Sequence, residues 1–557
     1  MTDDTANEAA PAAAEWPLRP WLLAGLLGLA GLLIHLVTQG NDDVPWQMAA
    51  AAFLFFGAIA AAFALERDSW KEPALFALAV GLVMAGLAWR AVRYGENLPD
   101  EQYGFAAGVV ATALALPLFQ AEFHRRRFAT PYSELYGHVW TDAISAAGAL
   151  AFTGLSWLVL VLMSELFHLL KIDFLRELME EGAFGWTFSG LAAGAALGTL
   201  RNQLKVLGTL QTVVLLVLSL LAVPLALGLT VFLLATAVSG PQVLWEATRS
   251  ATPVLLACAA GAWVLASAIV RYEDAAMSRS RVMRVAALVL AAVILPLAVF
   301  AAVSMGLRLG QYGLAPERLW GLVAIVVACA YGLGFWLALI RGRKTGWAAK
   351  MRQTNFHLGL FVGGLALLLA LPILDFGAIS TRNQVARLES GAVTPERFDF
   401  TALRWDFGTS GRNALERLSK SGNAKVAELA EAALTQKERV YATFDETNKA
   451  RADFNLRVVP DDAEVRERVL DYLVANPYRC HDRCVALDLG EASEGGGRRI
   501  AIVQSGGYEQ FVLEPGAALV SAEVARAEPT LAPDSVVEVS EARVIRVDGK
   551  IVGPPID

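Results

Sequence analysis

The sequence predicts an all-α polytopic membrane bundle of about eleven transmembrane helices, followed by a small α+β extracytoplasmic domain. Two observations predict this fold class. Of the 557 residues, 55% are hydrophobic and 18% are charged, and the mean hydropathy is +0.46. The charged residues are sparse from Trp21 to Leu374 and frequent afterwards. Within the sparse region, successive segments are apolar on all sides for roughly 17–25 residues, the length that crosses a bilayer as a helix.

The chain divides into three predicted regions. A cytoplasmic tail over residues 1–20 precedes the membrane bundle of residues 21–374, and a soluble α+β domain takes residues 375–557. The first apolar run is expected to be an uncleaved span, because residues 1–15 contain acidic residues and no basic residue, unlike a signal peptide. The expected spans cover residues 21–37, 46–65, 73–92, 103–121, 139–169, 184–200, 208–238, 252–271, 284–306, 319–340 and 355–374.

The seventh span, residues 208–238, contains Pro224 and could form one kinked helix or two short ones. Few polar residues surround Pro224, so a turn at this point would leave backbone groups without partners in lipid. Proline is tolerated inside membrane helices, because neighbouring helices can satisfy the freed carbonyl group. We therefore expect one kinked span.

Basic residues in short loops predict the orientation of the bundle. With the N-terminus in the cytoplasm, the inner loops hold about seventeen Lys and Arg residues and the outer loops about seven. The inner set includes Arg125, Arg126 and Arg127 and the basic cluster between Arg341 and Arg352. An odd number of spans then places residues 375–557 outside the cytoplasm.

The C-terminal region has the pattern of a soluble domain in which helices pack on a small antiparallel sheet. Helical spacing of apolar residues predicts helices over Asn423–Ala442 and Asp462–Ala475. From Val485 onward, short β-type runs alternate with Gly, Pro and Asp, and Asp548-Gly549 is typical of a hairpin turn.

Three stretches carry a resemblance to a known family. The first runs from Tyr132 to Leu200, the second is YGLAPERLW at Tyr312–Trp320, and the third is Ile379–Asp406. In the first stretch the matching residues are Tyr132, Leu135, Trp140, Phe152, Thr153, Gly154, Trp157, Leu166, Phe167, Phe184 and Gly190. These stretches resemble the bacterial inner-membrane family catalogued as domain of unknown function 4153. The resemblance implies a multi-pass protein of the bacterial inner membrane with a periplasmic C-terminal domain, and it implies no catalytic residue.

One polar group is predicted at the cytoplasmic entry to the fifth span. Glu134, His138 and Asp142 are spaced four residues apart, which places them on one face of a helix. They could form a proton or cation relay into the bundle. Their position at the edge of the span and not at its middle favours the alternative, an interfacial polar face at a helix end.

A second polar group lies near the outer end of the same span. Glu165 and His168 form an E-x-x-H pair, a spacing that occurs in di-iron helical bundles, where a second helix carries a matching pair. No second copy is present in the sequence, so no metal and no cofactor is expected. An intramembrane carboxylate paired with a neighbouring histidine or arginine is the expected arrangement.

Two further motifs favour structural roles. Gly190, Gly194 and Gly198 form a small-residue ladder, which predicts close helix packing of the sixth span against the fifth or seventh. Cys480 and Cys484 would lie in an oxidising compartment and are expected to form a disulfide. A redox or zinc role remains as the alternative, although His481 and Asp482 crowd a zinc site.

Two classes of function fit these observations. The first is a transport-like or solute-handling protein, with a cavity in spans five to nine lined by Glu165, His168, Glu134 and Asp142. The second is an envelope sensor or scaffold, whose bundle anchors a domain that binds an envelope protein. No known catalytic motif is present, so an enzyme is the third choice and no catalytic residue is assigned. The expected partners are the lipid bilayer and a small solute or an envelope protein; no basic face predicts nucleic acid.

Overall fold

The computed structural model describes residues 16–38, 44–67, 69–99, 101–240, 251–343, 346–436, 439, 454–476, 480, 483–491, 497–504, 507–513, 520–521, 544–547 and 550–551. The chain forms two compact units. Unit 1 comprises Met1–Glu389 and Ala402–Gly422, and unit 2 comprises Ser390–Thr401 and Asn423–Asp557. Unit 1 therefore extends past the predicted end of the bundle at residue 374, because short helices after the last span pack on loops of the bundle.

Unit 1 is a helical bundle. Within the described ranges, ten helices are long and apolar enough to cross a membrane, so the chain is a multi-pass membrane protein. They are α1 (Arg19–Thr38), α2 (Pro45–Ala64), α3 (Lys71–Tyr94), α4 (Glu101–Gln120), α6 (Tyr132–His168), α9 (Leu204–Ser239), α11 (Ala251–Val270), α12 (Arg281–Tyr312), α13 (Pro316–Gly342) and α14 (Trp347–Ala370). Short elements join them: η1 (Gly95–Asn97), α5 (Phe123–Arg126), η2 (Arg127–Ala129) and α7 (Phe174–Glu180).

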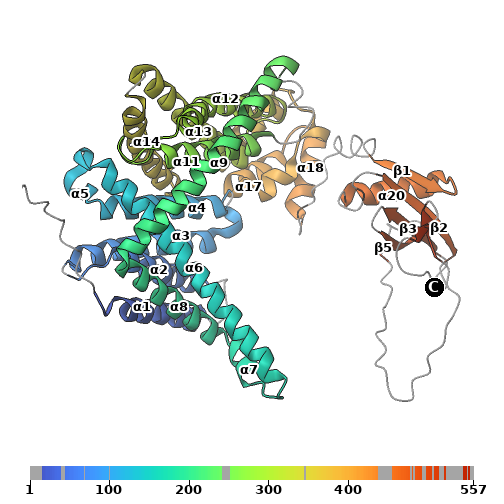
Figure 1. The fold of residues 1–557 in the computed structure, drawn as a ribbon. Coiled ribbons are helices and arrows are strands. Elements are labelled where there is room, and N and C mark those ends of the chain that lie inside the picture. Colours follow the sequence, from blue (N-terminus) through green and yellow to red (C-terminus); the bar gives the residue numbers. More distant parts are fainter. Residues whose placement is uncertain are drawn as a thin grey trace, which may run out of the picture. The chain divides into compact units, whose positions relative to one another are not determined.

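The sixth predicted span is α8 (Gly182–Asn202), a helix of 21 residues that is not among these ten. It lies beside α1 (Figure 1). A Cβ atom added to Gly190 would lie 2.6 Å from the carbonyl carbon of Leu27, and one added to Gly198 would lie 2.5 Å from Cα of Pro20. The ladder does mark a close helix contact, and its partner is α1, which the sequence did not predict; α8 also contacts α6 and α9, the fifth and seventh predicted spans.

α1 packs on this ladder because it carries glycines of its own. A Cβ atom on Gly28 would lie 2.7 Å from Cγ of Leu191, and one on Gly31 would lie 2.8 Å from the carbonyl carbon of Trp186. Small residues on both helices let the two backbones approach, which is the main source of helix association in lipid. The face of α8 that carries the ladder is therefore used by α1, while α8 also contacts α6.

The predicted seventh span is a single helix. α9 has 36 residues and contains Pro224 in its interior, as the scarcity of polar residues around this proline predicts. Its middle part packs with α11, α12, α13 and α14 around a core rich in alanine, in which Ala262, Ala287 and Ala291 are fully buried. Alanine at the contact points allows these helices to pack closely.

Short helices follow α14. They are α15 (Phe376–Glu389), η3 (Pro395–Arg397), α16 (Phe400–Trp405), α17 (Gly408–Leu418) and α18 (Ala424–Thr435). α15 is fixed to the loop before α13, because Asn383 Oδ1 accepts a hydrogen bond from the backbone of Leu314 (2.8 Å) and Gln384 Nε2 donates to the Tyr312 carbonyl (2.8 Å). α17 is fixed to η1, which follows α3, because Arg412 Nη1 donates to Asn97 Oδ1 at 2.7 Å.

Unit 2 contains a five-stranded sheet in the order β1-β2-β3-β4-β5, with α20 (Ala463–Ala475) on one face. The strands are β1 (Asn455–Val459), β2 (Arg483–Glu491), β3 (Arg498–Gln504), β4 (Gly507–Leu513) and β5 (Val520–Ser521), and β6 (Arg546–Val547) pairs with β7 (Lys550–Ile551). Helices on a small antiparallel sheet were expected, and three of the four pairings are antiparallel. β1 differs: it runs parallel to β2, because the chain crosses between them through α20.

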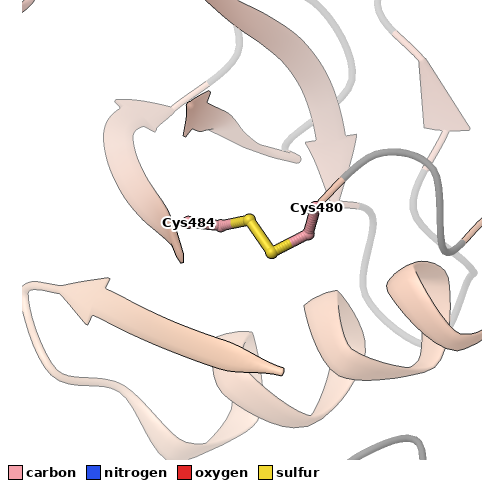
Figure 2. Close-up of a disulfide and its surroundings, with 2 residues drawn as sticks. All are labelled: Cys480 and Cys484. Carbon is pink, nitrogen blue, oxygen red and sulfur yellow. A yellow bond between two sulfur atoms is a disulfide. The ribbon is translucent and has the colours of Figure 1, made fainter. Parts of the chain in front are cut away.

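Cys480 and Cys484 form a disulfide in unit 2 (Figure 2). Both residues are buried in the core between α20 and the sheet, beside Val465 and Val469. His481 and Asp482, residues 437, 438 and 440–442 of the predicted helix, and the predicted turn at Asp548-Gly549 lie outside the described residues.

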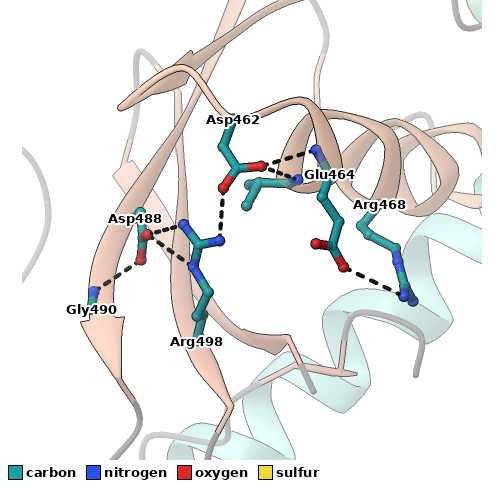
Figure 3. A network of polar contacts seen from close by, with 7 residues as sticks. Asp462, Glu464, Arg468, Asp488, Gly490 and Arg498 are labelled. Carbon is teal, nitrogen blue, oxygen red and sulfur yellow. Dashed lines mark hydrogen bonds and ion pairs between the residues drawn. The ribbon is translucent and has the colours of Figure 1, made fainter. Parts of the chain in front are cut away.

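An ionic network joins two strands and the start of α20 in the same unit (Figure 3). Arg498 Nη2 lies 2.5 Å from Asp488 Oδ2, and Arg498 Nη1 lies 2.7 Å from Asp462 Oδ2. Asp462 also accepts hydrogen bonds from the first backbone N–H groups of α20, so it caps this helix. The Arg498 guanidinium lowers the pKa of Asp462, and the two carboxylates raise the pKa of Arg498.

Candidate functional site

Unit 1 contains an apolar cavity of about 980 Å³ among six helices. None of the residues that line it carries a formal charge. They come from α4, α6, α11, α12, α13 and α14: Tyr103, Ala106, Ala107, Val110, Ala113, Leu114, Pro117, Leu118, Tyr132, Leu135, Tyr136, Val139, Trp140, Ala143, Leu256, Ala259, Ala260, Trp263, Val264, Ser267, Ile294, Trp320, Val323, Ala324, Val327, Ala328, Tyr331, Asn355, Phe356, Gly359, Leu360, Val362, Leu365, Ala366 and Leu369.

Neutral polar groups gather at one end of the cavity. Asn355 Oδ1 accepts a hydrogen bond from Trp263 Nε1 at 3.0 Å. Asn355 Nδ2 lies 3.4 Å from both the Tyr132 hydroxyl and Ser267 Oγ. The Tyr136 hydroxyl lies 3.5 Å from the backbone carbonyl of Ser267. Asn355 therefore joins α6, α11 and α14 through side chains that can each offer a further donor or acceptor.

Aromatic side chains mark the other end. The rings of Tyr103 and Trp320 stack with their centroids 5.4 Å apart, and Phe376 of α15 packs edge-on against Trp320 at 5.1 Å. Along α14 the lining runs from Asn355 to Leu369, which is about 21 Å at 1.5 Å per residue. The cavity thus follows most of the thickness of a hydrocarbon core of about 30 Å.

The sequence-predicted polar residues do not lie in this cavity. Glu134 is exposed and pairs with Arg126 Nη1 at 2.7 Å, and His138 is half-buried. Asp142 is half-buried and accepts a hydrogen bond from Gln120 Nε2 at 3.3 Å. Its second oxygen, Oδ2, is buried and has no hydrogen-bond partner among the described residues.

Glu165 and His168 lie at the opposite end of α6, about 35 Å along the helix from Asp142. Both are exposed, and His168 Nδ1 contacts Asp173 Oδ1 at 2.5 Å, so its partner follows the helix and does not come from a neighbouring span. The prediction that these residues line a cavity with Glu134 and Asp142 is wrong for the cavity described above, because 23 residues of helix separate the two groups. Among the described residues, no group of three or more His, Cys, Asp or Glu side chains could hold a metal ion.

Arginines beside the Asp142 region satisfy backbone carbonyls at helix ends. Arg201 Nη1 donates to the Ala62 carbonyl at 2.6 Å, at the end of α2. Arg19 Nη1 donates to the carbonyl of Arg201 at 3.1 Å, and Asn202 Nδ2 donates to that of Trp16 at 2.8 Å. The last carbonyls of a helix lack partners within the helix, and a cation beside them is favourable. These contacts fix α1, α2 and α8 to one another.

Comparison with protein families identifies the chain. The family described as "Domain of unknown function (DUF4153)" matches residues 22–418. The chain belongs to this family. The match begins in α1 and ends in α17, so it includes the first four spans as well as the three stretches that carry the resemblance in the sequence. No curated protein and no solved structure matches the chain.

In this DUF4153 member, a search for charged side chains does not find the cavity, because none of its lining residues is charged. A signal is nonetheless present in the sequence. Tyr132, Tyr136 and Trp140 recur every four residues and so share one face of α6, and Asn355 is a neutral polar residue inside an apolar helix. Such side chains within a membrane helix hydrogen-bond across to other helices, which is the role of Asn355 here.

Proposed function

We propose that this DUF4153 protein handles a solute inside the membrane, and that it holds an apolar or amphipathic molecule in the cavity between α4, α6 and α11–α14. The observation that carries the proposal is the cavity itself, whose volume of about 980 Å³ and apolar wall are those of a small-molecule site. A narrow set of polar groups at one end, centred on Asn355, supports a fixed orientation of the bound molecule.

The chemistry of the wall argues against an ion as the occupant. An ion that enters an apolar site loses its hydration, and this cost is recovered only by opposite charges or several hydrogen bonds. The lining offers Asn355, Ser267 and four tyrosine hydroxyls and no charge. A long hydrocarbon chain with a neutral polar end would bury its apolar surface along the cavity and hydrogen-bond to Tyr132 or Asn355.

The proposed location is the bacterial inner membrane, with the N-terminus in the cytoplasm and unit 2 in the periplasm. The excess of Lys and Arg in the loops next to Arg127, Arg201 and Arg341 supports this orientation. The Asn355 end of the cavity is then nearer the cytoplasmic side, because Asn355 follows the basic loop before α14. The end at Tyr103 and Trp320 is nearer the periplasmic side.

Photolabelling of the full chain in neutral lipid nanodiscs tests the proposal. The probe is a long-chain fatty alcohol that carries a diazirine on its hydrocarbon chain, and labelled peptides are mapped by mass spectrometry. Gly359 lines the cavity, and a Cβ atom added there has no atom within 4 Å, so Gly359→Phe fills the space without a clash. Gly364, five residues along α14, has equally open surroundings but does not line the cavity, so Gly364→Phe is the matched control.

We expect labelling of α11 and α14 in the wild type and in Gly364→Phe, and a several-fold loss in Gly359→Phe. Equal labelling of the two variants would show that the probe samples only the lipid-facing surface, and the proposal would fail.

The second candidate, an envelope sensor or scaffold, is favoured by unit 2, which has hydrophobic cores of its own on both faces of the sheet. The variant Glu165→Gln distinguishes the sequence-based hypothesis, in which Glu165 lines the solute site, from the cavity centred on Asn355. Since Glu165 is exposed and outside the cavity, we expect this variant to bind the probe as the wild type does.

A further inference from the structure

A second, polar groove lies outside the cavity, between α15 and α17. Its volume is about 380 Å³. One face of each helix lines it, with residues Ala378, Thr381, Arg382, Val385, Ala386, Glu389, Ser410, Asn413 and Arg417. All of these belong to unit 1. The groove is built on a fixed base, because the other face of α15 is hydrogen-bonded to the loop before α13, as described above.

Two arginines in this groove have guanidinium groups without a partner among the described residues. In the part of the chain that the structure describes, the side chains of Arg382 and Arg417 are both exposed and form no ion pair and no hydrogen bond. Their neighbours on the same helices are used: Arg387 Nη2 donates to the Gln311 carbonyl, and Arg412 Nη1 donates to Asn97 Oδ1, both at 2.7 Å. The groove therefore holds two guanidinium groups that remain available for an external anion.

A buried hydroxyl in the same groove also lacks a partner. Thr381 is 5% exposed, and its Oγ1 has no hydrogen-bond partner among the described residues. Threonines in helices commonly donate to the carbonyl four residues earlier, as Thr153 and Thr187 do in this chain. A buried polar group without a partner is unfavourable, and an oxygen atom of a ligand in the groove would satisfy it.

We propose that this groove binds a phosphate group, presented either by a lipid headgroup or by a small soluble phosphate. A guanidinium group donates two parallel hydrogen bonds to phosphate oxygens, and such charge-assisted bonds are about twice as strong as neutral ones. Thr381 and Asn413 supply additional hydrogen bonds. This site is separate from the cavity and goes beyond the function proposed for it.

The position of the groove fits a headgroup as one source. α15 begins six residues after the end of α14, and Phe376 of α15 contacts Trp320 at the aromatic end of the cavity. Glu389 is the acidic residue in the lining, and it is exposed at the last position of α15. Its carboxylate opposes a bound anion, so its removal should strengthen binding.

The test uses the full chain in maltoside detergent micelles, which contain no phosphate, with inorganic phosphate as the first probe and short-chain phosphatidylglycerol as the second. The variants are Arg382→Gln, Arg417→Gln and Thr381→Val, and binding is measured by isothermal titration calorimetry. Arg93→Gln is the matched control, because Arg93 is an exposed arginine at the end of α3 that does not line the groove.

We expect each groove arginine variant to weaken binding of at least one probe by about tenfold or more, and Arg93→Gln to leave it unchanged. Glu389→Gln should tighten binding. Thr381→Val should weaken it while preserving or raising the melting temperature without ligand, since it removes an unsatisfied hydroxyl.

Binding of inorganic phosphate alone would identify a soluble phosphate as the source, and arginine-dependent binding of phosphatidylglycerol alone would identify the headgroup. The proposal is overturned if neither probe binds, or if Arg93→Gln weakens binding as much as Arg382→Gln. Melting temperatures of all variants exclude loss of fold as the cause.

Discussion

Substitution of Gly194 by alanine tests the packing of α8 on α1, the contact that the glycine ladder creates. The added Cβ atom would lie 2.5 Å from the carbonyl carbon of Leu23 and 2.7 Å from Cα of Ala24, and it would also meet the Leu23 carbonyl oxygen. Favourable carbon contacts lie at about 3.5–4.0 Å. All three atoms belong to the backbone, so no side-chain rotation relieves the clash, and the helices must separate by about 1 Å.

The expected cost is about 1–3 kcal/mol of folding free energy, the range for overpacking a well-packed interface. Gly25→Ala is the matched control, because a Cβ atom on Gly25 of α1 has no atom within 4 Å. The two variants gain the same helix propensity, so their difference reports the contact alone. Unfolding of the reconstituted protein by a denaturing detergent measures it. Equal stability of Gly194→Ala and Gly25→Ala would refute the described α1–α8 contact.

Two further predictions concern unit 2. Replacing both Cys480 and Cys484 with serine removes a covalent cross-link and places two polar hydroxyl groups at buried positions. We therefore expect the free energy of unfolding of unit 2 to fall by about 2 kcal/mol or more, measured by guanidinium unfolding. An unchanged unfolding midpoint would contradict this. The lowered pKa of Asp462 implies stability that is present above its ordinary value of 3.8 and is lost as pH falls through the lower folded value. The guanidinium concentration at the unfolding midpoint of the wild type should therefore decrease as the pH is lowered below about 4. Arg498→Gln should remove most of this pH dependence.

The membrane helices could be predicted from the sequence because the bilayer imposes a length and an apolar surface on each one. α9 illustrates this: its apolar character continues through Pro224, and the structure has a single helix there. The parallel pairing of β1 with β2 could not be predicted in the same way. Strand direction depends on the connection between strands, and the sequence pattern identified α20 but not the short strand before it.

The candidate cavity could not be predicted, because periodicity assigns residues to helix faces and does not give the volume left between faces. Tyr132 and Asn355 are separated by 223 positions in the sequence and meet at 3.4 Å. Cys480 and Cys484 are the opposite case, since their separation of four residues already limits their geometry. Local motifs were therefore assigned more securely than the site, which depends on six helices at once.

The distribution of charge in unit 1 explains why the positions of charged residues in the sequence do not predict the cavity. Arg201 and Arg19 donate to backbone carbonyls at helix ends, and Glu134 pairs with Arg126 outside the apolar spans. Each of these charges stabilises a place where backbone groups or opposite charges need a partner. In the cavity an unpaired charge would remain without compensation, so neutral side chains such as Asn355 supply the polarity there. In this bundle the polarity of the proposed binding site therefore comes from neutral side chains inside apolar helices.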